Sequence, residues 1–202
     1  RCTEEGIVVF NSPGANANAV KELVMAGLLL SSRGIYNGMN FATKLTNVSH
    51  AEMGPLLESE KKKFKGQELA GKTLGVVGLG AIGSSVANMA LHMGMKVVGF
   101  DPAISVDAAW RLPSQVQKAE NIQQLLSKSD YITLHVPAIE ATKNLINKDT
   151  LEATKDGARL LNFARESIVN TQDAIAALES GKLSRYVTDF PTPELICRDD
   201  VI

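Results

Sequence analysis

The chain has 202 residues, of which 45% are hydrophobic, and its formal net charge is −1. This length suits one large domain or one domain with an appendage, and a charge so close to zero creates no field that would attract nucleic acid or an anionic membrane. The longest apolar run, around residues 24–30, is far too short to span a bilayer. We therefore expect a cytoplasmic protein without nucleic-acid or membrane partners.

The two cysteines, Cys2 and Cys197, lie at opposite ends of the chain and lack the spacing of a metal site. They are most simply two reduced thiols of a cytosolic protein. We expect no metal ligands in this chain.

The first third of the chain is predicted to be mostly helical. A short apolar run at 7–10 predicts a strand, and apolar spacing predicts a helix over 13–33. A more charged helix is expected over 50–64, although Gly54 and Pro55 should break or kink it.

From residue 74 onward, strands and helices are predicted to alternate with short connections. The expected strands are 74–79, 96–100, 131–136, 159–164 and 186–190. The expected helices are 82–93, 122–126, 148–154 and 171–180. This alternation predicts an α/β fold with a doubly wound parallel sheet of the Rossmann type, preceded by an N-terminal helical extension.

The segment 71–102 contains the most informative motif. Gly78, Gly80 and Gly83 form G-x-G-x-x-G between a predicted strand and a predicted helix. The first glycine permits a tight turn, the second lets the backbone approach a pyrophosphate, and the third lets the helix pack closely. Asp101 ends the next strand, where a carboxylate would hold the ribose hydroxyls of NAD and repel the 2′-phosphate of NADP. The alternative is a plain structural turn.

Three charged residues follow the later strands. Arg165 comes directly after the predicted strand 159–164, and open α/β sheets bind ligands at the carboxyl ends of their strands. Its planar guanidinium suits a carboxylate, because the fork binds two oxygens at once. Asp189 and Glu194 follow the last predicted strand and would lie on the same edge. On the residues alone, each of the three has an alternative as an exposed loop residue.

Taken together, these segments resemble the D-isomer-specific 2-hydroxyacid dehydrogenases, and within that family the 3-phosphoglycerate dehydrogenases. The resemblance covers nearly the whole chain. It is carried by the segments VVFNSPGANANAVKELVMAGLLLSSR, FKGQELAGKTLGVVGLGAIG, NFARESIVN and LSRYVTDFPTPE.

The resemblance implies roles for individual residues. Arg165 matches the arginine that binds the substrate carboxylate and carbonyl, and Glu194 matches the glutamate that raises the pKa of a catalytic histidine. That histidine exchanges a proton with the substrate oxygen while a hydride moves to or from the nicotinamide. The positions that the resemblance assigns to cofactor binding are Gly78, Gly80, Ala81, Ile82, Gly83, Asp101, His135, Val136, Pro137, Phe163, Ala164, Arg165 and Asp189.

The chain departs from the family pattern at several positions. Glu166 replaces a usual glycine, and Asn170 replaces a usual aspartate. The family's histidine lies in a P-H-x-G-A-like segment after the glutamate, and His50, His92 and His135 do not match that segment.

The resemblance also implies a domain organisation. Residues 1–202 would form an NAD-binding domain, with a helical dimerisation segment over about 13–66 and a Rossmann core over 71–190. The substrate domain would lie outside this chain. We therefore expect a homodimer that binds NAD but turns over substrate only within a longer parent.

Several functions are compatible with this pattern. The first is a dehydrogenase acting on 3-phosphoglycerate and 3-phosphohydroxypyruvate in serine synthesis. Other 2-hydroxy or 2-keto acids, such as glyoxylate, lactate or formate, define sister enzymes. A third alternative is an NAD-sensing transcriptional corepressor of the same fold, which acts by binding partner proteins.

Overall fold

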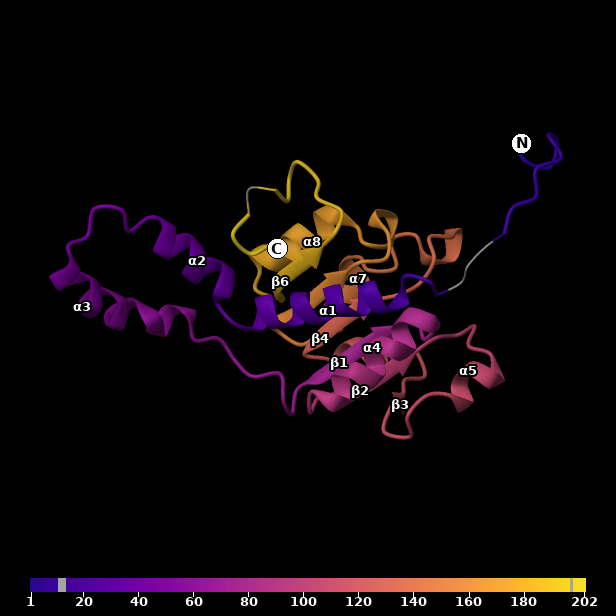
Figure 1. The fold of residues 1–202 in the computed structure, drawn as a ribbon. Helices are drawn as coiled ribbons and strands as arrows, with labels where there is room; N and C mark the ends of the chain where they lie inside the picture. The colour runs from indigo at the N-terminus through magenta and orange to yellow at the C-terminus, as the bar shows by residue number, and fades with distance from the viewer. Residues whose placement is uncertain (11–13, 197) are drawn as a thin grey trace.

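The computed structural model describes residues 1–10, 14–196 and 198–202, so the predicted helix start at Pro13 and the Cys197 thiol lie outside it. Its core is a six-stranded parallel sheet in the order β3-β2-β1-β4-β5-β6 (Figure 1). The strands are β1 (Thr73–Val77), β2 (Lys96–Phe100), β3 (Gln117–Lys118), β4 (Tyr131–Leu134), β5 (Ala158–Asn162) and β6 (Leu183–Thr188). The sheet is wound outward from the central pair β1 and β4, which confirms the predicted Rossmann-type fold.

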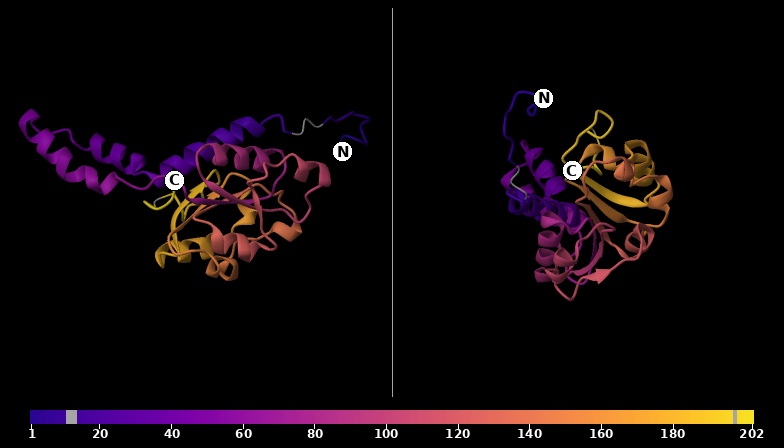
Figure 2. Two further views of the ribbon diagram at one scale, coloured as in Figure 1. Left: turned by 90° about the horizontal axis from the view of Figure 1, so that it is seen from below. Right: turned by 90° about the vertical axis from the view of Figure 1, so that its right-hand side faces the viewer.

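Helices cover both faces of the sheet (Figure 2). One face packs against α1 and α4 through Val24, Leu28 and Val86, and the other packs against α6, α7 and α8. The helices of the core are α1 (Ala17–Ser32), α4 (Ala81–His92), α5 (Val106–Trp110), α6 (Ile122–Lys128), α7 (Lys148–Glu152) and α8 (Thr171–Glu179), with short 3₁₀ turns η2 (Glu140–Thr142) and η3 (Glu166–Ile168). In the described part of the chain, no helix combines the length and hydropathy that crossing a membrane requires.

Two local predictions were wrong. The run 7–10 forms no strand: its side chains are between 58% and 89% exposed, so nothing buries them as a sheet would. The charged helix is not broken at Pro55, because α3 (His50–Glu60) continues through it before the 3₁₀ turn η1 (Lys61–Phe64). Proline removes a single main-chain bond there, and the Glu52 carboxylate supports the first turn by accepting from the Ser49 N–H and hydroxyl.

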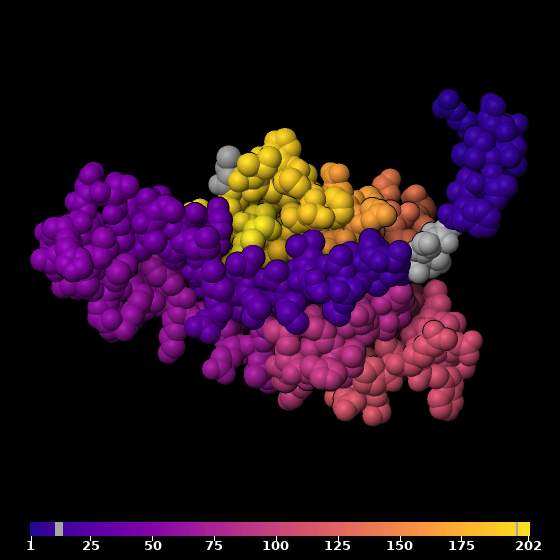
Figure 3. All heavy atoms as spheres, in the orientation of Figure 1, coloured from indigo at the N-terminus to yellow at the C-terminus, as the bar shows by residue number. Residues whose placement is uncertain are grey.

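The segment from α2 (Ile35–Thr43) to η1 forms an arm that projects away from the body of the molecule (Figures 1 and 3). Neither α2 nor α3 has a buried residue. Large apolar side chains of the arm stand in solvent, and Phe41 packs its ring 5.5 Å from that of Phe64. The exposed apolar residues are Ile35, Tyr36, Met39 and Leu57. The arm therefore lacks a core of its own.

The two ends of the arm are joined to each other by the main chain. The Gly34 N–H donates to the Phe64 carbonyl at 3.1 Å, and the Gln67 N–H donates to the Ser32 carbonyl at 2.9 Å. Gly66 adopts a φ of +62°, and a Cβ there would lie 2.1 Å from the Ser32 oxygen. Only glycine fits at this crossing.

A buried polar cluster attaches the base of the arm to the amino-terminal edge of the sheet. The Tyr131 hydroxyl, at the start of β4, lies 2.8 Å from the Ser32 hydroxyl and accepts a bond from Gln67 at 3.3 Å. The Arg159 guanidinium lies 5.0 Å from the centre of the Tyr131 ring and donates to the Ser31 carbonyl. We call these residues the arm latch.

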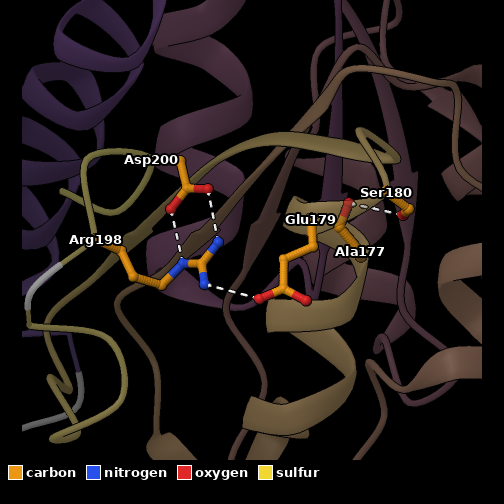
Figure 4. A network of polar contacts seen from close by, with 5 residues as sticks. All are labelled: Ala177, Glu179, Ser180, Arg198 and Asp200. Atoms are coloured by element: carbon orange, nitrogen blue, oxygen red, sulfur yellow. Dashed lines mark hydrogen bonds and ion pairs between the residues drawn. The ribbon is translucent and has the colours of Figure 1, made fainter.

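The last residues extend the sheet beyond β6. The Tyr186 N–H donates to the Asp200 carbonyl at 3.0 Å, and Tyr186 pairs with Val201 in a parallel bridge. The Arg198 guanidinium holds both carboxylate oxygens of Asp200 at 2.9 Å and reaches Glu179 of α8 at 3.2 Å (Figure 4). This guanidinium lowers the pKa of Asp200. The C-terminal segment is thereby fixed to α8 and β6.

The arm latch contributes measurably to stability. We expect Tyr131→Phe to lower the free energy of unfolding by about 1–2 kcal/mol, because the buried Ser32 and Gln67 side chains lose a partner. Urea denaturation measures the change. The matched control is Tyr36→Phe at an exposed position, which should change stability by less than about 0.5 kcal/mol. Equal effects of the two variants would contradict a stabilising latch.

Candidate functional site

The carboxyl ends of the strands meet at one edge of the sheet, and a predicted site residue follows each of five strands. These residues are Gly78 after β1, Asp101 after β2, His135 after β4, Phe163 after β5 and Asp189 after β6. The connections diverge between β1 and β4, and in open α/β sheets this switch point opens a crevice for ligands. The crevice is the natural place to look for a site.

Two of the three motif glycines are required by the protein's own packing. Gly78 has a φ of +90°, and a Cβ there would lie 2.5 Å from the His135 carbonyl oxygen. A Cβ at Gly83 would lie 1.9 Å from the Gly78 carbonyl oxygen. Gly80 differs, because a Cβ there would meet nothing within 4 Å. The missing side chain at Gly80 leaves room outside the protein, as the approach of a phosphate requires.

The glycine turn is followed directly by α4, whose N-cap is Gly80. The first N–H groups of such a helix are free to bind an anion, and the helix dipole favours negative charge there. Asp101 lies against the turn: its carboxylate accepts from the Leu79 N–H and from the Ala103 N–H, each at 2.9 Å. The predicted ribose-binding acid is therefore within one hydrogen bond of the predicted phosphate loop.

Two clefts flank the glycine turn. A cleft of about 400 Å³ on the β2 side is mostly apolar, with Asp101 among its lining residues. A cleft of about 460 Å³ on the β4 and β5 side is lined by Asn16, Val20, Ile82, His135, Val136, Pro137, Ala138, Phe163, Ala164 and Arg165. The residues present therefore fit a dinucleotide, with its adenosine half on the first side and its nicotinamide half on the second.

His135 is held neutral in the second cleft. Burial lowers its pKa from an ordinary 6.5 to about 4. Its Nε2 lies 3.0 Å from the hydroxyl of Thr133, which is fully buried in β4. The imidazole thus contributes a polar but uncharged wall at neutral pH.

Arg165 is exposed and lies between the second cleft and a third cleft of about 630 Å³. Glu166 and Asn170, which depart from the family pattern, line this third cleft together with Lys143. The departures therefore change the surroundings of Arg165 and leave the lining of the dinucleotide clefts unchanged.

The structure does not bring every predicted site residue into these clefts. Glu194 is exposed in the loop after β6 and lines none of the three clefts; hydrogen bonds from the Thr192 side chain and its own N–H lower its pKa. Asp189 is also exposed, and its N–H donates to the Asn162 carbonyl at 3.2 Å.

Sequence reasoning missed Asn16 and Val20. They come from the beginning of α1, which packs beside α4 across the sheet (Figure 3). No local motif marks them, because their place in the cleft depends on how α1 docks.

A strand–glycine turn–helix unit with an acid after the second strand defines a dinucleotide-binding domain. Residues 37–201 match the family model described as "D-isomer specific 2-hydroxyacid dehydrogenase, NAD binding domain". The chain belongs to this family of D-isomer-specific 2-hydroxyacid dehydrogenases and contains its NAD-binding domain.

Relatives and solved structures agree with this assignment. A D-3-phosphoglycerate dehydrogenase of Methanocaldococcus jannaschii is 34% identical over 93% of this chain and 33% of its own length. A hydroxypyruvate reductase of Thermotoga maritima is 35% identical over 96% of this chain and 60% of its own length. The chain therefore spans less than two thirds of both relatives.

Two structures are similar over nearly all of the chain. D-mandelate dehydrogenase of Rhodotorula graminis superposes with a TM-score of 0.83 at 29% identity, covering 99% of this chain and 58% of that one. D-lactate dehydrogenase of Aquifex aeolicus, in complex with NAD and lactic acid, has a TM-score of 0.77 at 29% identity, covering 100% of this chain and 62% of that one.

The open space at Gly80 allows binding and folding to be separated. Gly80→Ala should weaken NADH binding at least about 10-fold with little change in melting temperature, because the methyl group enters only the space that a phosphate needs. Gly83→Ala should lower stability by several kcal/mol, since backbone must move. Calorimetric NADH titration and thermal unfolding measure the two effects. Unchanged NADH affinity in a folded Gly80→Ala protein would contradict a phosphate at this turn.

The pKa of His135 predicts a pH dependence of folding. The unfolded chain binds a proton near pH 6.5 that the folded chain refuses until about pH 4. Stability should therefore fall by about 2 kcal/mol as the pH is lowered from 6.5 to 5. Urea unfolding at several pH values measures this slope. His135→Gln should flatten it, whereas the control His92→Gln, on the exposed side of α4, should retain it.

Proposed function

We propose that this chain is the cofactor domain of an NAD-dependent dehydrogenase that interconverts a 2-hydroxy acid and a 2-keto acid, with 3-phosphoglycerate and 3-phosphohydroxypyruvate as the preferred pair. The carrying observation is Arg165, which stands at the border of the proposed nicotinamide cleft, directly after β5. The 3-phosphoglycerate dehydrogenases among the relatives support this substrate. The hydroxypyruvate reductase and the D-lactate dehydrogenases support the wider class of 2-hydroxy acids.

In this proposal, residues 71–190 are the Rossmann core, and a substrate domain outside residues 1–202 completes the cleft. NAD, when bound, supplies the hydride acceptor. Arg165 holds the substrate carboxylate through its two-pronged guanidinium and stabilises negative charge on the substrate oxygen. Glu194 orients a histidine that lies outside this chain. Asp101 binds the ribose hydroxyls, and His135 remains neutral beside the nicotinamide.

Turnover by the full-length protein tests the proposal. NADH oxidation should be measured with 3-phosphohydroxypyruvate, glyoxylate, pyruvate and hydroxypyruvate. Arg165→Ala should lower kcat/KM by about 100-fold or more and leave NADH affinity within about 3-fold, because the substrate contact alone is lost. The control Arg111→Ala removes an exposed arginine away from the clefts. The isolated chain should bind NADH without turnover. Absence of turnover with every 2-keto acid would instead favour a corepressor.

The position of Asp101 predicts a cofactor preference. NAD(H) should bind more tightly than NADP(H) by about 10-fold or more, because a 2′-phosphate would face a carboxylate in a partly desolvated cleft. Asp101→Asn should narrow this preference, since the amide keeps an oxygen for the Leu79 N–H but carries no charge. Calorimetry with both reduced cofactors measures the ratio. Equal affinities in the unmutated chain would refute the preference.

We further propose that residues 13–66 form a homodimer, in which each arm packs on the partner. The arm supports this proposal, because it exposes Met39, Ile35 and Leu57 and buries none of its helical residues. Such a surface needs a covering partner. Sedimentation equilibrium should show a dimer for the unmutated chain and a shift toward monomer for Met39→Asp. The control Val106→Asp, exposed on α5, should remain dimeric. A concentration-independent monomer would refute the dimer.

A further inference from the structure

Asn162 occupies the end of β5, three residues before Arg165, and its side chain is fully buried. A buried amide is costly unless its oxygen and its nitrogen both have partners. A residue of this kind at the edge that carries the site needs an explanation that the cofactor clefts do not provide, since Asn162 lines none of them.

The Asn162 amide holds the loop that leads to Arg165. Its Oδ1 accepts from the Ala164 N–H at 3.1 Å, and its Nδ2 donates to the Arg165 carbonyl at 2.9 Å. The same Nδ2 lies 3.5 Å from the hydroxyl of Tyr186, whose pKa is raised by burial. Because the oxygen and the nitrogen both bind the loop, the amide fixes its path on two sides.

The Ala164 peptide links this amide to the arginine side chain. Its N–H bonds to the Asn162 oxygen, and its carbonyl accepts from Nη1 of Arg165 at 2.5 Å. A displacement of the Asn162 amide would therefore move the group that the guanidinium rests on. The coupling runs through two consecutive hydrogen bonds and requires no distant pathway.

The main chain of Asn162 also reaches the neighbouring loop. Its carbonyl accepts from the Asp189 N–H at 3.2 Å, where β6 ends. One residue thus joins the loop that bears the proposed substrate arginine to the loop that bears the proposed nicotinamide aspartate.

We propose that Asn162 is a positioning residue, which sets the conformation in which Arg165 is presented to the substrate carboxylate. The inference rests on the proposed function of Arg165. Asparagine alone among residues of this size offers an acceptor to Ala164 and a donor to Arg165 together. An aspartate would keep the acceptor and turn a carboxylate oxygen toward the Arg165 carbonyl, whereas a serine is too short to reach both.

The test uses the full-length enzyme and the 2-keto acid that it reduces best. Asn162→Asp and Asn162→Ser should each lower kcat/KM by about 10- to 100-fold, mostly through a higher KM, with NADH affinity within about 3-fold. Hydrogen exchange of the Ala164 amide should accelerate in both variants, because its acceptor is displaced. If the aspartate variant does not fold, the serine variant carries the test.

Two controls separate positioning from general destabilisation. Thr154→Val removes a different buried hydrogen bond, from the Thr154 hydroxyl to the Leu151 carbonyl, at a site away from the clefts. Tyr186→Phe removes the 3.5 Å contact and leaves both loop bonds in place. Both controls should keep kcat/KM within about 3-fold of the unmutated enzyme even where melting temperature falls.

A double-mutant cycle with Arg165→Ala decides the outcome. If Asn162 acts through Arg165, adding Asn162→Asp to Arg165→Ala should lower kcat/KM by less than about 3-fold further. Independent, multiplicative losses would overturn the positioning role and leave the proposed function intact. If Arg165→Ala itself has no effect on kcat/KM, the proposed function fails and this inference fails with it.

Discussion

The site depends on one steric constraint, the close approach of α4 to the glycine turn after β1. A methyl group at Gly83 would lie 1.9 Å from the Gly78 carbonyl oxygen, so backbone meets backbone and no rotamer change can relieve the contact. This contact sets the direction of α4 and turns its first N–H groups toward the crevice beside β1. The strand order then places the other site residues around the same crevice.

Two buried polar clusters act at opposite edges of the sheet. At the amino-terminal edge, Tyr131 and Ser32 tie the arm to β4; at the carboxyl edge, Asn162 ties the Arg165 loop to β5. Each cluster is specific because a buried donor or acceptor without its partner costs more than a mispacked apolar side chain. The sheet thereby keeps the surface proposed for association apart from the surface that binds NAD.

The predicted core agreed with the structure because its signals are local. Buried parallel strands such as β1 and β4 appear as short continuous apolar runs, and a glycine turn followed by a helix identifies the order of the elements. The missed elements are short or unpartnered. β3 has two residues and α5 has five, too few for a periodic pattern, and α2 is a helix without a buried side. The run 7–10 has strand-like composition but no neighbouring strand to pair with.

The sequence by itself determined the class of fold, the dinucleotide motif and the position of Arg165 directly after a strand, because each follows from residues adjacent in the chain. Only the tertiary structure decided which side chains meet. It put Asn16 of the segment before α1 beside His135, joined Asn162 to the Arg165 loop and left Glu194 exposed outside the clefts. These outcomes depend on contacts between segments far apart in the chain, and such contacts are set by the packing of whole helices and loops against the sheet.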